Sequence, residues 1–176
     1  MILRFYPKKD STLYEYYPQR NTGLDAVLEI SKTIQNTASY NSRILIDFDY
    51  ATISSSIASL GHNPNLFNYN LKLYVSDASE IPTDYTLYAY PVSGSWSMGV
   101  GRYGNLPETT NGVSWQYKDT ADDTSTTWQT GSFAAGSTGS WATAAGGGNW
   151  YTASVASQSF TYTTTDVDMD VTSIIR

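Results

Sequence analysis

Alternation of apolar and polar residues recurs in several short segments of this chain, and it constrains the fold more than any other feature. In RILIDFDY the side chains of Ile44, Ile46 and Phe48 would share one face of an extended chain. Residues 70–75 and 85–90 alternate in the same way. Successive side chains of a β-strand point to opposite sides of the sheet, so a period of two predicts strands. Clusters of Gly, Pro, Asn and Ser separate these segments, which is typical of a sandwich or barrel.

The alternation also names the residues expected in the core. Nine apolar side chains should face inward between two sheets: Ile44, Ile46, Phe48, Leu71, Leu73, Val75, Val167, Met169 and Val171. Helical signals are weaker. The segment GLDAVLEISKTIQ fits a helix or a strand through AVLEI, and TISSSIASLG fits a short helix that a glycine ends. The sequence predicts an all-β, jelly-roll-like antiparallel β-sandwich with little helix, forming a single domain over residues 1–176.

The C-terminal segment DVDMDV places aspartates at three alternate positions, Asp166, Asp168 and Asp170. A metal site would need oxygens that converge from several directions, whereas carboxylates along one strand face stand in a row about 6–7 Å apart. The segment also lacks the glycine and glutamate of a calcium-binding EF-hand loop. The pattern therefore favours a strand with buried valines and methionine and solvated aspartates, with metal ligands as the alternative.

Composition excludes several classes of function. The net charge is −6 and no basic run occurs, which argues against nucleic acid and anionic membranes as partners. The absence of cysteine excludes disulfides and thiolate metal sites. The N-terminal residues lack the apolar core of a secretory signal, and no apolar stretch is long enough to span a membrane, so we expect a soluble protein.

Residues able to carry out catalysis are sparse. His62 is the only histidine, and it lies in the turn-like segment GHNPN without a nucleophile motif. No pattern pairs the carboxylates as a glycosidase requires, and GVGRYG lacks the lysine of a phosphate-binding loop. We expect no catalytic residue, no cofactor and no metal. A lyase or hydrolase acting on glycans is the weakest of three functional hypotheses.

Tryptophans accumulate between Gly94 and Trp150, a stretch rich in Gly, Ser and Thr and too long for one ordinary connection. We expect long loops with short strands inside, forming the surface that meets partners or glycans. Indole rings stack on sugars, but they also fill cores and interfaces. Trp96 and Trp115 are expected to anchor loops to the core. The candidate contacts with a glycan or a partner are Trp128, Trp141, Trp150 and Tyr151.

Several motifs occur in a recognisable order along nearly the whole chain. They are an N-x-G turn, an arginine that opens a strand ending in FD, an L-x-L-Y-V strand, W-x-x-G, V-x-W, and a late D-V-T strand. Their residues here are Asn21 and Gly23, Arg43, Phe48 and Asp49, Leu71 to Val75, Trp96 and Gly99, Val113 and Trp115, and Asp170 to Thr172. This order resembles the DNRLRE-type β-sandwich, a relative of alginate-binding carbohydrate-binding modules. The resemblance implies structural roles for Arg43 and Asp49, which would hold loops by ion pairs or hydrogen bonds.

The opening FYPKKDSTLYEYYPQRNTGLDAVLEISK is similar to virion structural proteins of marine tailed bacteriophages. The resemblance implies a tail, fibre or capsid-surface component of an extracellular particle. Such a protein packs against other virion proteins as a homo-oligomer or in repeated copies. The alternative function is a carbohydrate-binding module or adhesin for a host surface glycan. Alginate-binding members are expected to use basic residues against their acidic polymer, whereas this chain is acidic.

In the resembled family a turn and one more strand follow the D-V-T segment, whereas this sequence ends at Arg176. The preceding strand would then border an empty position, with unpaired N–H and C=O groups. A neighbouring chain, an N-terminal segment or further residues of a longer protein could each supply the missing strand. The first alternative predicts that the C-terminal strand lies at or near a subunit interface, with the aspartates discouraging unrelated strands.

Overall fold

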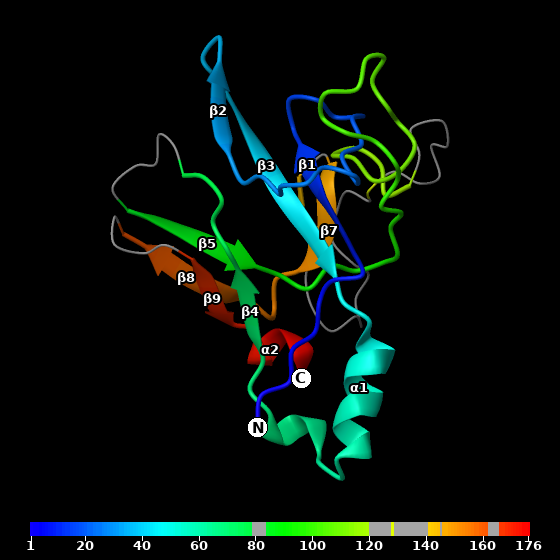
Figure 1. Cartoon of the computed structure of the whole chain (residues 1–176). Helices are drawn as coiled ribbons and strands as arrows, with labels where there is room; N and C mark the ends of the chain where they lie inside the picture. Colours follow the sequence, from blue (N-terminus) through cyan, green and yellow to red (C-terminus); the bar gives the residue numbers. More distant parts are fainter. Residues whose placement is uncertain (79–83, 120–127, 129–140, 145, 162–165) are drawn as a thin grey trace.

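The computed structural model describes residues 1–78, 84–119, 128, 141–144, 146–161 and 166–176 (Figure 1). Over these residues the protein is all-β, with antiparallel strands and little helix, as the sequence predicts. The strands are β1 (Lys9–Tyr14), β2 (Lys32–Gln35), β3 (Ala38–Asp47), β4 (Asn70–Leu73), β5 (Tyr85–Ala89), β6 (Trp141–Ala144), β7 (Gly146–Tyr151), β8 (Ala156–Phe160) and β9 (Val167–Asp170). The helices are α1 (Tyr50–Ser59), the 3₁₀ turn η1 (Pro64–Leu66) and α2 (Thr172–Ile175).

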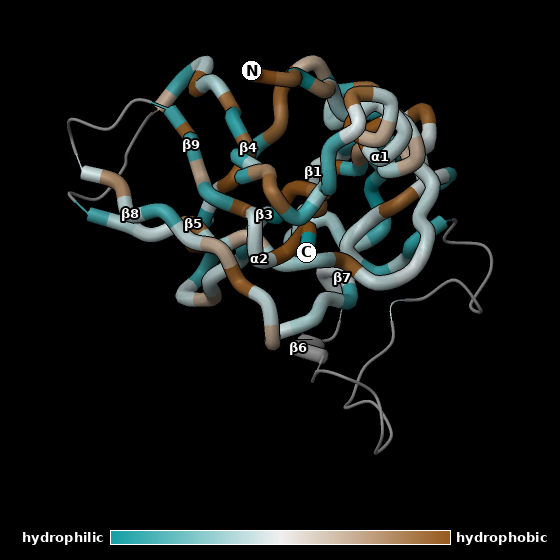
Figure 2. The backbone as a smooth tube through the Cα atoms, turned by 90° about the horizontal axis from the view of Figure 1, so that it is seen from below, coloured by the Kyte–Doolittle hydropathy of each residue, from teal (hydrophilic) through white to brown (hydrophobic). Residues whose placement is uncertain are grey.

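Strand β3 is the longest strand and pairs on both edges. It lies between β1 and β2 in the order β1-β3-β2, with Tyr14 opposite Ser42 and Lys32 opposite Asn41. The pairs β4–β9, β5–β8 and β6–β7 complete the antiparallel arrangement. Figures 1 and 2 show β4, β5, β8 and β9 together on one side of the molecule, and β1, β3 and β7 on the other.

Two hydrophobic clusters match these two sides. The first joins β1 and β3 to buried tryptophans, and its members are Leu13, Leu45, Trp96, Val113, Trp115 and Trp128. The second lies between β8 and β9 and contains Ala156, Phe160, Val167 and Met169, with half-buried side chains from β4 and β5 packed against it. Three of the five tryptophans therefore serve the first cluster.

The predicted core is confirmed in β9 and wrong in register along β3. Val167 and Met169 are buried while Asp168 and Asp170 face solvent, as expected for a strand with one covered face. In β3 the buried apolar residue is Leu45, whereas the predicted Ile44 and Ile46, and Phe48 just after the strand, are only half-buried. The loop tryptophans pack on the face that carries Leu45, a choice that alternation alone does not determine. Val75, also predicted inside, is 43% exposed.

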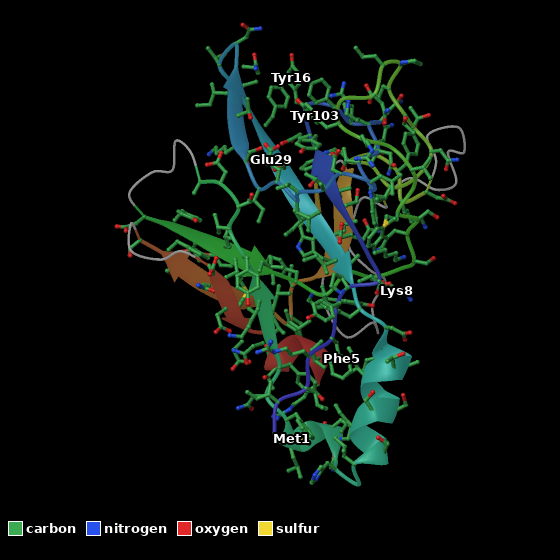
Figure 3. The ribbon with its side chains drawn as sticks, in the orientation of Figure 1. Met1, Phe5, Lys8, Tyr16, Glu29 and Tyr103 are labelled. Carbon is green, nitrogen blue, oxygen red and sulfur yellow. The ribbon has the colours of Figure 1, made fainter. Side chains whose placement is uncertain are left out.

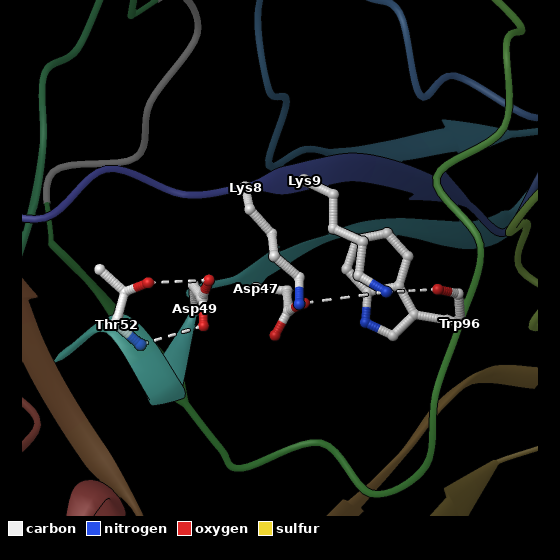
Figure 4. A network of polar contacts seen from close by, with 6 residues as sticks. All are labelled: Lys8, Lys9, Asp47, Asp49, Thr52 and Trp96. Carbon is white, nitrogen blue, oxygen red and sulfur yellow. Dashed lines mark hydrogen bonds and ion pairs between the residues drawn. The ribbon is translucent and has the colours of Figure 1, made fainter. Parts of the chain in front are cut away.

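The two uncertain helical segments differ. TISSSIASLG forms most of α1, as predicted: Asp49 accepts the backbone N–H of Thr52 at 3.2 Å and its hydroxyl at 2.9 Å, and Gly61 follows with φ of +70° (Figure 4). GLDAVLEISKTIQ forms neither a helix nor the strand AVLEI; its only strand is β2, which begins at Lys32. In the residues before β2, backbone N–H groups donate to side-chain hydroxyls instead: that of Glu29 to Thr12 at 3.0 Å and that of Ser31 to Ser42 at 2.6 Å.

Asn21 connects the segments that carry the sequence motifs. It is fully buried, and its amide Nδ2 donates to the carbonyl oxygens of Met98 at 2.7 Å and Val113 at 2.8 Å. Its Oδ1 accepts from the N–H of Gly101 at 2.7 Å. Any side chain at Gly23 would collide with the carbonyl oxygen of Met98. The N-x-G turn, the W-x-x-G loop and the V-x-W segment are thus parts of one hydrogen-bonded junction.

Candidate functional site

A tyrosine-rich cleft opens between the β2–β3 hairpin and the loop around Tyr103 (Figure 3). Its volume is about 100 Å³. Side chains from β1, β2, β3 and the loops after β1 and Gly99 line it: Tyr14, Glu15, Tyr16, Tyr17, Glu29, Ser31, Thr33, Gln35, Tyr40, Asn41 and Tyr103. Figure 3 shows Tyr16 and Tyr103 near each other at the end of the molecule opposite Met1, with Glu29 below them. We call these residues the tyrosine cleft.

The rings of the tyrosine cleft contact one another, most of them edge to face. The ring centroid of Tyr16 lies 4.8 Å from that of Tyr17 and 5.0 Å from that of Tyr40, at interplanar angles of 88° and 78°. Tyr103 lies 5.0 Å from Tyr14 and 5.6 Å from Tyr17. Tyr16 and Tyr103 remain 45% and 42% exposed, so they present ring surface to solvent while neighbouring rings fix their positions.

Arg20 supports the cleft from behind. Its guanidinium carbon lies 3.8 Å from the ring centroid of Tyr17 and 4.8 Å from that of Tyr103. Its Nη2 lies 3.5 Å from a carboxylate oxygen of Glu108, and the arginine side chain is only 12% exposed. A planar guanidinium stacks on aromatic faces, so Arg20 holds the two rings without entering the cleft.

Two carboxylates face the same cleft. Glu29 accepts the hydroxyl of Tyr14 at 2.9 Å, and Glu15 accepts the backbone N–H of Asn41 at 2.8 Å and its side-chain amide at 3.1 Å. Burial, followed by the hydrogen bond to Glu29, raises the pKa of the Tyr14 hydroxyl far above its usual value. That hydroxyl therefore stays neutral and keeps donating to Glu29. Aromatic rings beside fixed hydrogen-bonding groups suit a ligand with apolar faces and hydroxylated edges, such as a sugar.

Arg43, which was expected to hold a loop, lies between two indole rings. Its guanidinium carbon is 4.6 Å from the Trp115 ring centroid and 4.5 Å from that of Trp150. Burial lowers the pKa of Arg43 from its ordinary value. The other strand-end residue, Asp49, begins helix α1 as described above. Trp96 is buried beneath the ammonium of Lys9, which donates to the Trp96 carbonyl and also lies 3.8 Å from Asp47 (Figure 4).

The four candidate contact residues lie apart from the tyrosine cleft. Trp128 is 4% exposed, and its ring N–H donates to the carbonyl of Ser114 at 3.0 Å, so both its faces are covered. Trp141 begins β6, and its side chain lies outside the described part of the structure. Trp150 and Tyr151 are half-buried at the end of β7. Trp150 continues a row with Tyr90 at 6.2 Å and Tyr88 beyond it at 6.3 Å.

Sequence reasoning missed the tyrosine cleft because its members are spread over residues 14–103. The available signal was the dense run YEYY before Arg20, but two of its rings needed Tyr40 and Tyr103 from distant segments to make a surface. His62 lies elsewhere, beside Phe67 with ring centroids 6.0 Å apart.

The three aspartates in and just before β9 have separate partners. Asp168 pairs with Lys72 at 2.6 Å, Asp166 accepts the N–H of Val75 at 2.9 Å, and Asp170 accepts that of Thr172 at 2.9 Å. Among the described residues, no group of three or more His, Asp or Glu side chains could hold a metal ion. None of the helices in this part of the chain is both long and apolar enough to cross a membrane.

Comparison with known proteins identifies the family of this chain. The sequence profile of carbohydrate-binding module family 96 matches residues 2–120, which include every residue of the tyrosine cleft and exclude Trp128, Trp141, Trp150 and Tyr151. No curated protein and no solved structure matches the chain. The match covers well over half of the sequence, so this chain belongs to carbohydrate-binding module family 96.

Proposed function

We propose that the protein is a non-catalytic glycan-binding module and that the tyrosine cleft is its binding site. The observation that carries the proposal is the pair of rings, Tyr16 and Tyr103, that are solvent-exposed yet fixed by neighbouring aromatic side chains. Family membership supports carbohydrate as the ligand class, and the matched region contains the whole cleft.

The geometry suits binding because little order has to be created when the ligand arrives. A tyrosine side chain has few rotatable bonds, so it loses little conformational entropy when a ligand binds. Tyr17 already restricts both exposed rings, and Arg20 restricts that of Tyr103. Ser31, Thr33 and Asn41 supply hydrogen-bonding groups at the edge of the cleft. A sugar ring can therefore stack on tyrosine while its hydroxyls bond to the surrounding polar groups.

The test begins with a glycan array of neutral, amino and acidic oligosaccharides and continues by calorimetry on the best ligand. Removing the ring in Tyr16→Ala or Tyr103→Ala should weaken binding about three- to tenfold, the range expected for one aromatic contact. Tyr88→Ala is the matched control, because Tyr88 is an exposed tyrosine of β5 outside the cleft. Circular dichroism of each variant checks that the fold is retained.

Two outcomes would contradict the proposal. Absence of binding to any glycan on the array would remove the proposed function. A large loss in Tyr88→Ala with none in Tyr16→Ala or Tyr103→Ala would move the site to the row formed by Tyr88, Tyr90 and Trp150.

We further propose that the module works on a bacteriophage particle, as a tail, fibre or capsid-surface protein in repeated copies. Support comes from the similarity of the N-terminal segment, from Phe5 to Lys32, to virion structural proteins. A surface position on such a particle would let a glycan-binding cleft meet the host. Mass spectrometry of purified particles, followed by antibody labelling in electron micrographs, should find the chain in the virion, and its absence there would refute this location.

A further inference from the structure

The tyrosine cleft is acidic. Glu15 and Glu29 are the charged residues among its lining side chains, and both carry negative charge. Asp25 lies at its border, where its carboxylate accepts the N–H of Tyr103 at 3.1 Å. Arg20 packs on the rings of Tyr17 and Tyr103 but is not a lining residue, and the carboxylate of Glu108 already offsets its charge.

The strand geometry keeps a nearby cation out of the lining. Thr33 and Gln35 of β2 line the cleft. Side chains alternate along a strand, so Lys32 and Ile34 point to the opposite side of β2. The cleft therefore offers acceptors and negative charge without a lysine or arginine among its lining residues.

Both carboxylates retain capacity for a ligand. Glu15 and Glu29 each use Oε2 for the contacts that position them, while among the described contacts Oε1 of neither residue has a hydrogen bond. A carboxylate is an acceptor only, so these oxygens require a donor from the ligand. The tyrosine faces around them also attract a cation through their ring electrons.

We infer that the tyrosine cleft selects a glycan bearing protonated amino groups, of the 2-amino-2-deoxyhexose type, and rejects polyuronates. This inference rests on the proposed function and names its ligand class. An ammonium would bond to the free oxygen of Glu15 or of Glu29 while the sugar ring stacks on Tyr16 or Tyr103. A uronate in the same position would meet like charges in a partly enclosed site, a repulsion that gives specificity.

Calorimetry with three oligosaccharides of equal length tests the inference: one with free amines, its N-acetylated counterpart and a uronate. At mildly acidic pH we expect the amine to bind about tenfold more tightly than the acetylated form, and the uronate not to bind. Added salt should weaken amine binding and leave the acetylated form nearly unchanged, because only the first depends on charge.

Variants separate charge from shape. Glu29→Gln and Glu15→Gln keep the acceptor oxygens that position these side chains but remove the charge, so amine affinity should fall about three- to tenfold while acetylated affinity stays. Asp77→Asn is the matched control, since Asp77 is an exposed carboxylate outside the lining. Equal binding of amine and acetylated chains, or preference for uronate, would overturn the inference while the proposed function stands. Failure to bind any of the three or any array glycan would remove both.

Discussion

Arg43 donates from Nη1 to the carbonyl oxygen of Gly147 at 2.9 Å, which joins β3 to β7 across 104 residues of sequence. The same guanidinium stacks between Trp115 and Trp150. An arginine satisfies both needs because its planar group bonds in its plane and stacks on its faces. No side chain would fit at position 147, since a Cβ at Gly147 would collide with Arg43.

Arg43→Lys should therefore destabilise the protein although the charge is kept. The ammonium of lysine is a point charge and cannot stack between two indoles, so we expect a loss of about 1–3 kcal/mol in free energy of unfolding. Denaturant unfolding followed by tryptophan fluorescence measures it. Arg102→Lys, at an exposed position, is the control. A loss equal to that of the control would show that the stacking contributes nothing.

Asn21→Ala should cost more. It leaves the carbonyls of Met98 and Val113 and the N–H of Gly101 without their partner in a buried junction, and each unpaired group costs about 1–3 kcal/mol. We expect a loss of about 3 kcal/mol or more in thermal or denaturant melts, against little change for the exposed Asn68→Ala. A change below about 1 kcal/mol would contradict the role assigned to this residue.

Helix α1 should fray in acid. The backbone N–H of Thr52, followed by its hydroxyl, holds the pKa of the Asp49 carboxyl below its ordinary value. Because the folded pKa is depressed, this contribution to helix stability is present above the unfolded pKa and is lost as pH falls through the folded one. Carboxyl chemical shifts followed by NMR should show Asp49 titrating below 3.8. In Asp49→Asn, a neutral cap, the Thr52 amide should no longer respond to pH, and an unchanged response would count against this assignment.

The side chain of Gln158 bonds to the edge of β9 that faces away from β4. Its Oε1 accepts the N–H of Asp168 at 2.8 Å, and its Nε2 donates to the carbonyl of Asp166 at 3.1 Å, on the edge facing away from β4. A side-chain amide thus makes two of the bonds that a further strand would make. Gln158→Ala should speed hydrogen exchange of the Asp168 amide markedly, with Ser157→Ala on the other face of β8 as control.

The same variant tests whether the C-terminal strand lies at a subunit interface, which stays a prediction. Freeing the edge of β9 should strengthen pairing with another copy, since exposed strand edges recruit strands. Native mass spectrometry at several concentrations should then show more oligomer for Gln158→Ala than for the natural sequence. Identical oligomer populations would argue against edge pairing at β9.

The sequence by itself determined the all-β class and several of the strands. Period-two alternation fixed β4, β5 and the buried face of β9, because burial of one sheet face leaves that period in the chain. The glycine after α1 and the aspartate before it are local signals that need no tertiary context. The motif order also carried the family resemblance, because Asn21 needs its partners at fixed positions along the chain.

Only the tertiary structure decided which face of β3 is buried and which residues form the tyrosine cleft. Leu45 is buried in place of its neighbours because tryptophans from loops distant in sequence cover its side of the strand. Tyr16 and Tyr103 are 87 positions apart, and neither belongs to a motif that marks a binding site in its own segment. They form one cleft because Tyr17 contacts both rings and Arg20 packs on Tyr17 and Tyr103. Such contacts between distant segments leave no periodic signal in a sequence.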